Sequence, residues 1–298
     1  MYTEIAAERD ALEQAIADLA GAMPGRLGVH VRVLPGDLEV SFHADDLFPS
    51  ASVIKIPIMV EAYRQSANGS LSLEELLPLI QEEVTDGSGL LQYMHVGLQL
   101  TVTDAVELMI AISDNTATNL LLRRLGVAEV NETMQQLGLT QTRSGGPIRV
   151  ANGDTPLEQR SRTTPREITT LLTGIAQGTI VSADACAAMM RHLEHQLFND
   201  MLPRFLPIIA YPERVGLEQM PVQVAHKTGG LSGVRLDAGI ITAHTATGTR
   251  TAVVSAFTAD LDDGEIWTVE NVGCRTIAEV GRLVYDALLH LPDGDRQA

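Results

Sequence analysis

The stretch that decides the fold is residues 27–42, which read LGVHVRVLPGDLEVSF. Val29, Val31 and Val33 alternate with other residues, as in a strand with one buried face, and Pro-Gly-Asp at 35–37 is typical of a turn. The pattern therefore predicts a strand, a turn and a second strand near the start of the chain.

The other strand patterns lie at the far end of the chain. Short β-rich runs separated by glycine turns span 222–225, 236–243 and 251–258, and a helical pattern follows over 269–289. Between the two ends, apolar residues recur at helical spacing. The predicted helices, with one at the start of the chain, are 3–22, 71–83, 103–112, 116–125, 128–137 and 165–177.

This order of elements predicts an α/β (α+β) fold. An antiparallel sheet is built from both chain ends and flanked by helices, and an all-α subdomain is inserted between them. We expect one domain over residues 1–298, with 1–60 and 205–298 forming the α/β subdomain and 61–204 the helical one. Residues 144–164 are rich in glycine and proline without periodicity and predict a long loop.

The composition of the chain disfavours some classes of binding partner. The chain has 298 residues, 45% of them hydrophobic, and a net charge of −17, which disfavours nucleic acids and anionic membranes. We expect a small-molecule substrate and a monomer. The sequence contains no apolar run of membrane-spanning length, and residues 1–22 lack the basic and apolar segments of a signal peptide. The sequence therefore predicts a soluble chain and leaves its compartment open.

The cysteines and histidines give no pattern of a metal site. Cys186 and Cys274 are the only cysteines, and burial as free thiols is the more common outcome, with a disulfide as the alternative. The histidines show no paired metal-ligand spacing, so we predict neither a metal nor another cofactor.

Lysine usage is more informative, because the chain has 19 arginines and only two lysines, Lys55 and Lys227. A lysine amine, unlike a guanidinium, loses its proton when buried and can then act as a base. An arginine-biased composition with two chance lysines is the plain alternative.

Lys55 follows a serine at helical spacing in Ser52-Val53-Ile54-Lys55. Pro57 must lie in the first turn of a helix, which places Ser52 at the helix N-terminus. A hydroxyl three residues before an amine lies on the same helix face, so Ser52 is a candidate nucleophile beside a candidate base. By itself the pattern is weak, since an ordinary helix start explains it equally well.

Two further short motifs carry chemistry. Ser113-Asp114-Asn115 lies between two predicted helices, where side chains can point into a cleft, although Asn115 could simply cap the second helix. Lys227-Thr228-Gly229-Gly230 continues a predicted strand, where the glycines could let a ligand approach the strand edge or could form a plain turn.

These three elements, in this order, resemble the signature of class A β-lactamases and penicillin-binding proteins. The run from Ser113 to Leu122 (SDNTATNLLL), Leu137-Gly138-Leu139 and Thr163-Thr164-Pro165 are similar to class A enzymes as well. The resemblance covers the chain from about residue 20 to 290, and both lysines fall inside its motifs.

The resemblance implies acyl transfer by a serine nucleophile. Ser52 would attack the lactam carbonyl, and Lys55 would take the proton because burial and the nearby Lys227 lower its pKa. Backbone N–H groups of Ser52 and Gly230 would form the oxyanion hole. Ser113 would pass a proton to the departing nitrogen.

The remaining motif residues would bind substrate. Asn115 would contact Lys55 and the side-chain amide of the substrate, and Thr228 with Lys227 would hold its carboxylate. Arg235 is a second candidate cation for that carboxylate, with an exposed surface salt bridge as the alternative.

One expected residue is missing. Class A enzymes carry a loop glutamate before the Thr-Thr-Pro motif that activates the deacylating water, and the matching position here is Ile148. Asp154 and Glu158 lie in the same loop and are candidates for the deacylating base, with solvated surface charge as the alternative. The arginine–aspartate bridge that braces this loop in the family is not recognisable.

Two residues near the Lys227 motif have less certain roles. His226 would point away from Lys227 on the opposite side of its strand, as a supporting or packing residue. Asp237 could pair with Arg235 or lie at a sheet edge.

The leading interpretation is a serine β-lactamase-type hydrolase that opens the β-lactam amide through an acyl-enzyme on Ser52. The alternatives are a DD-peptidase or esterase-like serine hydrolase, and a penicillin-binding or sensor domain that is acylated without efficient turnover. A purely structural protein would leave Lys55 and Lys227 unexplained.

Overall fold

A computed structural model of the chain describes residues 2–36, 38–149, 160–208, 220–245, 248–262 and 266–291. Its centre is a five-stranded sheet with the strand order β2-β1-β9-β8-β7, in which every neighbouring pair is antiparallel. The strands are β1 (Arg26–Leu34), β2 (Glu39–Phe42), β7 (Val222–Leu231), β8 (Val234–Thr245) and β9 (Gly248–Ala259). The sheet is therefore built from both chain ends, as the sequence predicts.

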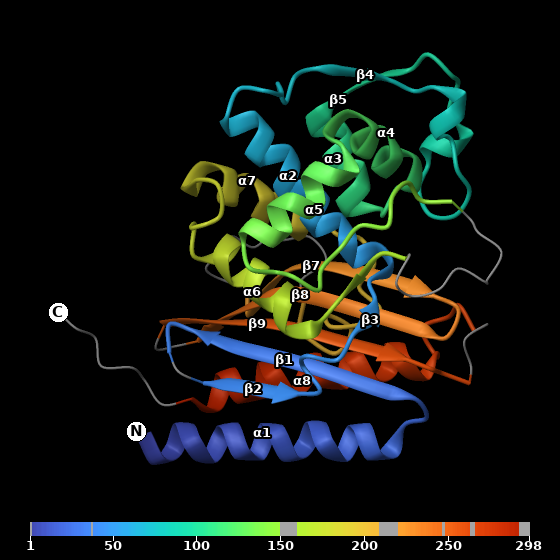
Figure 1. The fold of residues 1–298 in the computed structure, drawn as a ribbon. Helices are drawn as coiled ribbons and strands as arrows, with labels where there is room; N and C mark the ends of the chain where they lie inside the picture. The colour runs from blue at the N-terminus through green and yellow to red at the C-terminus, as the bar shows by residue number, and fades with distance from the viewer. Residues whose placement is uncertain are drawn as a thin grey trace.

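Helices cover both faces of the sheet (Figure 1). On one face, α1 (Tyr2–Ala22) and α8 (Val272–His290) pack against the strands around a core that includes Ile16, Val31 and Val254. The other face carries the helical body, which packs on the sheet around a second core. Its helices are α2 (Lys55–Ala67), α3 (Val102–Ala111), α4 (Asn115–Leu125), α5 (Val127–Gln136), α6 (Pro165–Ala176) and α7 (Ala183–Glu194).

Local sequence explains where several of these helices begin. Thr101 and Asp104 form a reciprocal capping box at the start of α3. Asp114 caps α4 by accepting from the backbone N–H of Ala117. Thr164 caps α6, and Pro165 occupies its first turn, where a missing N–H costs nothing.

The helix predicted over residues 71–83 is wrong. This segment contains strand β4 (Leu76–Pro78), which pairs with β5 (Gln99–Thr101), and a 3-10 turn over Gln81–Glu83. Leu77 and Leu79 are buried while Leu76 is 58% exposed, so the apolar residues follow a strand period, and Pro78 could not serve a helix interior. A second 3-10 turn follows over Leu91–Tyr93.

The inserted segment is therefore not purely helical. At the end of the predicted long loop, β6 (Arg162–Thr163) pairs with β3 (Phe48–Pro49), just before Ser52. The boundary expected between residues 60 and 61 falls inside α2, and the division into two subdomains stays a prediction.

Cys186 and Cys274 are both free and buried, which confirms the more common outcome for such residues. Within the described ranges, no helix combines the length and the apolar character that crossing a membrane requires.

We expect Gly281→Ala to lower the free energy of unfolding by about 1–3 kcal/mol, the range for overpacking a core. A Cβ at this position of α8 would lie 2.1 Å from the carbonyl oxygen of Leu202, so backbone must move. Urea unfolding measures the change. Gly21→Ala near the end of α1 is the matched control, since its Cβ would meet open space and Ala favours a helix by up to about 1 kcal/mol. Equal losses in the two variants would contradict this packing account.

Candidate active site

Ser52 lies in a 3-10 turn over Ala51–Ile54 that leads directly into α2. The helix proper begins at Lys55, so Pro57 lies in its first turn, as expected. Ala51 has a φ of +42°, a left-handed conformation that non-glycine residues rarely adopt. The backbone is therefore strained immediately before the candidate nucleophile, which is half-buried.

Strand β7 comes close to Ser52 because it carries a glycine there. A Cβ at Gly229 would lie 3.1 Å from the backbone nitrogen of Ser52 and 3.2 Å from that of Val53. Successive strand residues face opposite sides, so Gly230 faces away from Ser52 toward Arg235 and Trp267. Glycine at 229 is thus needed for the strand to approach the turn.

Lys55 has no solvent-exposed surface. Its Nζ donates to the carbonyl oxygen of Ser113 at 2.8 Å, to Oγ of Ser113 at 3.0 Å and to Oδ1 of Asn115 at 2.9 Å. Burial, and to a smaller extent the charge of Lys227, hold the pKa of Lys55 well below its usual value, against an opposing effect of Asp114. These contacts bring three of the predicted site residues together.

Lys227 is also fully buried, and its Nζ donates to the carbonyl oxygen of Thr228 at 2.9 Å. Burial lowers the pKa of Lys227 to about 7, although the charge of Asp237 opposes the shift. The site therefore contains two buried amines whose pKa values lie below the usual value of lysine.

Ser113 adopts a φ of +56°, so the second motif also contains a strained residue. Its carbonyl oxygen accepts from Lys55 and from Oγ of Ser88 at 2.9 Å. The backbone N–H of Asn115 donates to the carbonyl oxygen of Ser88 at 3.0 Å, and its Nδ2 to that of Asp86 at 3.1 Å.

Residues 85–91, which we call the brace, therefore hold the Ser113-Asp114-Asn115 motif in place. Sequence reasoning missed this role. Oδ2 of Asp114 accepts from the backbone N–H groups of Leu90 and Leu91 at 2.7 and 2.9 Å. A Cβ at Gly87 would lie 2.6 Å from Nδ2 of Asn115, and one at Gly89 would lie 2.3 Å from the carboxyl of Asp114. The Asp-Gly-Ser-Gly sequence at 86–89 was the available signal, but only the fold shows what it touches.

The face of β7 opposite Lys227 contains a second polar group. His226 and Asp237 are both buried, with Nδ1 of His226 2.9 Å from Oδ1 of Asp237. Asp237 also accepts from the backbone N–H of Leu202 at 3.0 Å and lies opposite Thr228 on the inner strand β8. His226 is a packed supporting residue, as predicted, whereas both alternatives for Asp237 are wrong because it pairs with His226 inside the sheet.

Arg235 is 3% exposed, so an exposed surface salt bridge is wrong for this residue. Its Nη1 donates to the carbonyl oxygens of Leu231 and Val234 at 2.7 and 2.8 Å, and its Nη2 to that of Ile266 at 2.7 Å. These carbonyls take three of the five N–H groups of the guanidinium.

The loop after α5 is held at Ile148. Oδ1 of Asn119 accepts from the backbone N–H of Ile148 at 2.7 Å, and Nδ2 of Asn119 donates to its carbonyl oxygen at 3.0 Å. Asn119 is a second residue whose role sequence reasoning missed, because its partner is a backbone group far along the chain. Asp154 and Glu158 lie outside the described residues.

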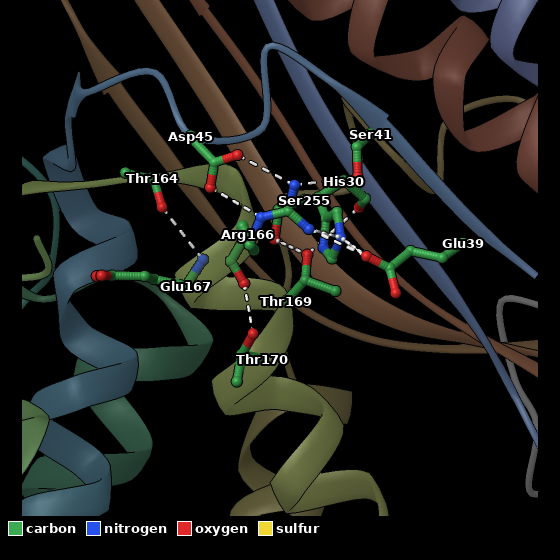
Figure 2. Close-up of polar contacts among 10 residues, drawn as sticks. All are labelled: His30, Glu39, Ser41, Asp45, Thr164, Arg166, Glu167, Thr169, Thr170 and Ser255. Atoms are coloured by element: carbon green, nitrogen blue, oxygen red, sulfur yellow. Dashed lines mark hydrogen bonds and ion pairs between the residues drawn. The ribbon is translucent and has the colours of Figure 1, made fainter. Parts of the chain in front are cut away.

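The far end of this loop is tied to the segment that carries Ser52. The backbone N–H of Ser50 donates to the carbonyl oxygen of Ser161 at 3.0 Å, next to the β3–β6 pair. Figure 2 shows Arg166, at the start of α6, fastening the chain that enters β3. Its Nε donates to Asp45 at 2.8 Å and its Nη1 to Glu39 at 3.0 Å.

Known proteins similar to this chain belong to one family. The model of the β-lactamase enzyme family matches residues 11–288. The β-lactamase of Mycobacterium tuberculosis (strain ATCC 25618 / H37Rv) is 28% identical over 183 residues, and this match spans 60% of the present chain and 59% of that relative's length.

Two solved structures are similar over nearly the whole chain. The β-lactamase from Sphaerobacter thermophilus DSM 20745 is 30% identical with a TM-score of 0.80, covering 94% of this chain and 98% of its own. PBP-A is 29% identical with a TM-score of 0.77, covering 94% and 97%. With a family match over almost its full length and a fold shared with these structures, the chain belongs to the β-lactamase enzyme family.

Proposed function

We propose that this protein is a serine hydrolase that opens the amide of a β-lactam through an acyl-enzyme on Ser52. The observation that carries the proposal is the buried Lys55 amine, whose pKa is lowered and which contacts both Ser113 and Asn115. A lysine amine with a lowered pKa, at the third position after a half-buried serine, is suited to remove the proton of that serine.

The reaction follows from these contacts. Lys55 takes the proton of Ser52 while Oγ bonds to the lactam carbonyl carbon, and the backbone N–H groups of Ser52 and Gly230 stabilise the oxyanion. When the C–N bond breaks, Ser113 gives its proton to the nitrogen. The 3.0 Å contact between Nζ of Lys55 and Oγ of Ser113 returns a proton to that serine.

Substrate binding is assigned to the strand edge and the second motif. Lys227 and Thr228 hold the carboxylate of the substrate, Asn115 contacts its side-chain amide, and Gly229 keeps β7 close to Ser52. Ile148, which is apolar, occupies the position of the family's water-activating glutamate, so it supplies no base for deacylation. Asp154 and Glu158 remain the proposed candidates for that base.

A second candidate function is a penicillin-binding or peptidase-type enzyme in which the β-lactam acyl-enzyme is long-lived. The residue at position 148 favours it, because an isoleucine whose backbone is held by Asn119 offers no carboxylate to activate water. The similarity to PBP-A agrees with this candidate. The L158E mutant of PBP-A, which is 29% identical to this chain, has a structure as an acyl-enzyme complex with penicillin G.

The test is the intact mass of the protein after mixing with penicillin G, followed over time beside the absorbance of the β-lactam. We expect a mass increase equal to the whole penicillin, and none in Ser52→Ala, because ring opening retains every atom. Many turnovers per enzyme identify a β-lactamase. A stable adduct with a single turnover identifies the second candidate, and the absence of both an adduct and turnover contradicts both.

We expect Ile148→Glu to shorten the lifetime of the acyl-enzyme by about tenfold or more, the scale on which a positioned general base acts. Ile148→Gln is the matched control, since it has a similar shape without a base. Acyl-enzyme decay after rapid removal of free penicillin measures the lifetime. Equal lifetimes in the two variants would show that position 148 does not face the ester.

We expect the second-order rate constant of acylation to fall as pH rises above about 7, where Lys227 loses its charge. The sign follows from burial, which favours the neutral amine and so weakens the pairing with a substrate carboxylate at higher pH. The matched control is penicillin G methyl ester, which has no carboxylate and should lack this decline. The same decline for the ester would remove Lys227 from carboxylate binding.

A further inference from the structure

Trp267 is the only tryptophan of the chain, and it is 63% exposed. A Cβ at Gly230 would lie 3.2 Å from Cζ3 of its indole, so the ring lies over the Cα of that residue. Gly230 is the strand residue whose N–H is assigned to the oxyanion hole. A large aromatic surface is therefore presented to solvent beside a strand residue of the proposed oxyanion hole.

Arg235 fixes this indole in place. Its guanidinium carbon lies 4.4 Å from the ring centroid, within the range of a cation–π contact. The three backbone carbonyls that accept from Arg235 hold the guanidinium itself. The ring is thus ordered before any ligand arrives, which lowers the entropic cost of binding against it.

The surroundings of the ring are apolar and open. Leu231 is 39% exposed and Ile266 is 45% exposed, and the carbonyls of both accept from the same guanidinium. β7 lies at the end of the strand order, and in the described part of the chain no further strand pairs with its outer edge. A ligand along this edge can therefore extend over the indole.

We propose that Trp267 is a specificity-determining residue that packs against a flat apolar or aromatic group of the acyl donor. This inference rests on the proposed acylation of Ser52 and names the substrate class that the site favours: amides carrying such a group on the side that passes Gly230. Arg235 is then a positioning residue that acts through the indole.

The first measurement is tryptophan emission of the Ser52→Ala variant, which keeps binding reversible. Penicillin G has a phenyl ring on its side chain, and 6-aminopenicillanic acid has the same bicyclic core without the side chain. We expect penicillin G to change the emission at saturation and 6-aminopenicillanic acid to change it less, because the only indole reports on its own contacts.

The second measurement is the ratio of acylation rate constants for the two compounds in the chain with Ser52 intact. We expect Trp267→Ala to lower the preference for penicillin G about three- to tenfold, the scale of one aromatic pair. Trp267→Phe should restore most of it. Phe205→Ala is the matched control, since Phe205 is also half-exposed and stacked on an arginine, at 5.3 Å from Arg204.

The outcomes separate the two proposals. An unchanged preference in Trp267→Ala, or an equal loss for both compounds, would overturn the role of Trp267 while leaving acylation of Ser52 intact. An emission change without a change in preference would overturn it as well, because the indole would sense binding without selecting. If neither compound acylates the unaltered protein, the proposed function fails first, and this inference fails with it.

Discussion

The site depends on burying two lysine amines inside the fold. Removing an ammonium group from water is costly, and the usual relief is a paired carboxylate, which would raise the pKa and keep the amine charged. The oxygens that accept from Lys55 are instead a carbonyl, a hydroxyl and a side-chain amide. These neutral partners satisfy the N–H groups without locking the proton in place, so desolvation decides the pKa. The burial that costs stability is therefore also what lowers the pKa of Lys55.

Two strained residues lie close to Lys55, one just before it in the chain and one that accepts hydrogen bonds from its amine. Ala51 and Ser113 both adopt left-handed conformations, which together cost on the order of 2–6 kcal/mol. The surrounding structure offsets this cost through the brace at 85–91, whose hydrogen bonds converge on Ser113, Asp114 and Asn115. The brace holds the hydrogen-bond acceptors of Lys55 in fixed positions. A flexible loop in its place would let water reach the amine.

Much of the fold and the centre of the site could be predicted from the sequence, because those signals are local. The alternation at Val29, Val31 and Val33, the position of Pro57 and the spacing of Ser52 and Lys55 depend on residues close in the chain. The brace at 85–91 and the hold of Asn119 on Ile148 could not be predicted. Each of these hydrogen bonds involves a backbone atom and joins residues 23 or more positions apart, which leaves no side-chain pattern in the sequence.

Arg235 shows a second limit of prediction from the sequence. Its position on β8 opposite Gly230 is what a cation for the substrate carboxylate would require. Orientation, however, depends on where the carbonyls of Leu231, Val234 and Ile266 fall, and these claim its Nη1 and Nη2. A motif can therefore place a charged residue on the expected strand, while the partners of its N–H groups depend on backbone atoms that the motif does not specify.

The loop between α5 and β6 is hydrogen-bonded at both ends to segments of the candidate site. Its start is fixed at Ile148 by Asn119, and its end is fixed to the Ser52 segment through Ser50 and Ser161. A loop pinned at both ends can place a side chain reproducibly against an ester on Ser52. The residue held at its start is an isoleucine, which has no carboxylate to act as a base. In the proposed reaction, acylation and deacylation therefore depend on different parts of the structure: the first uses the residues around the buried amines, and the second needs a carboxylate from elsewhere.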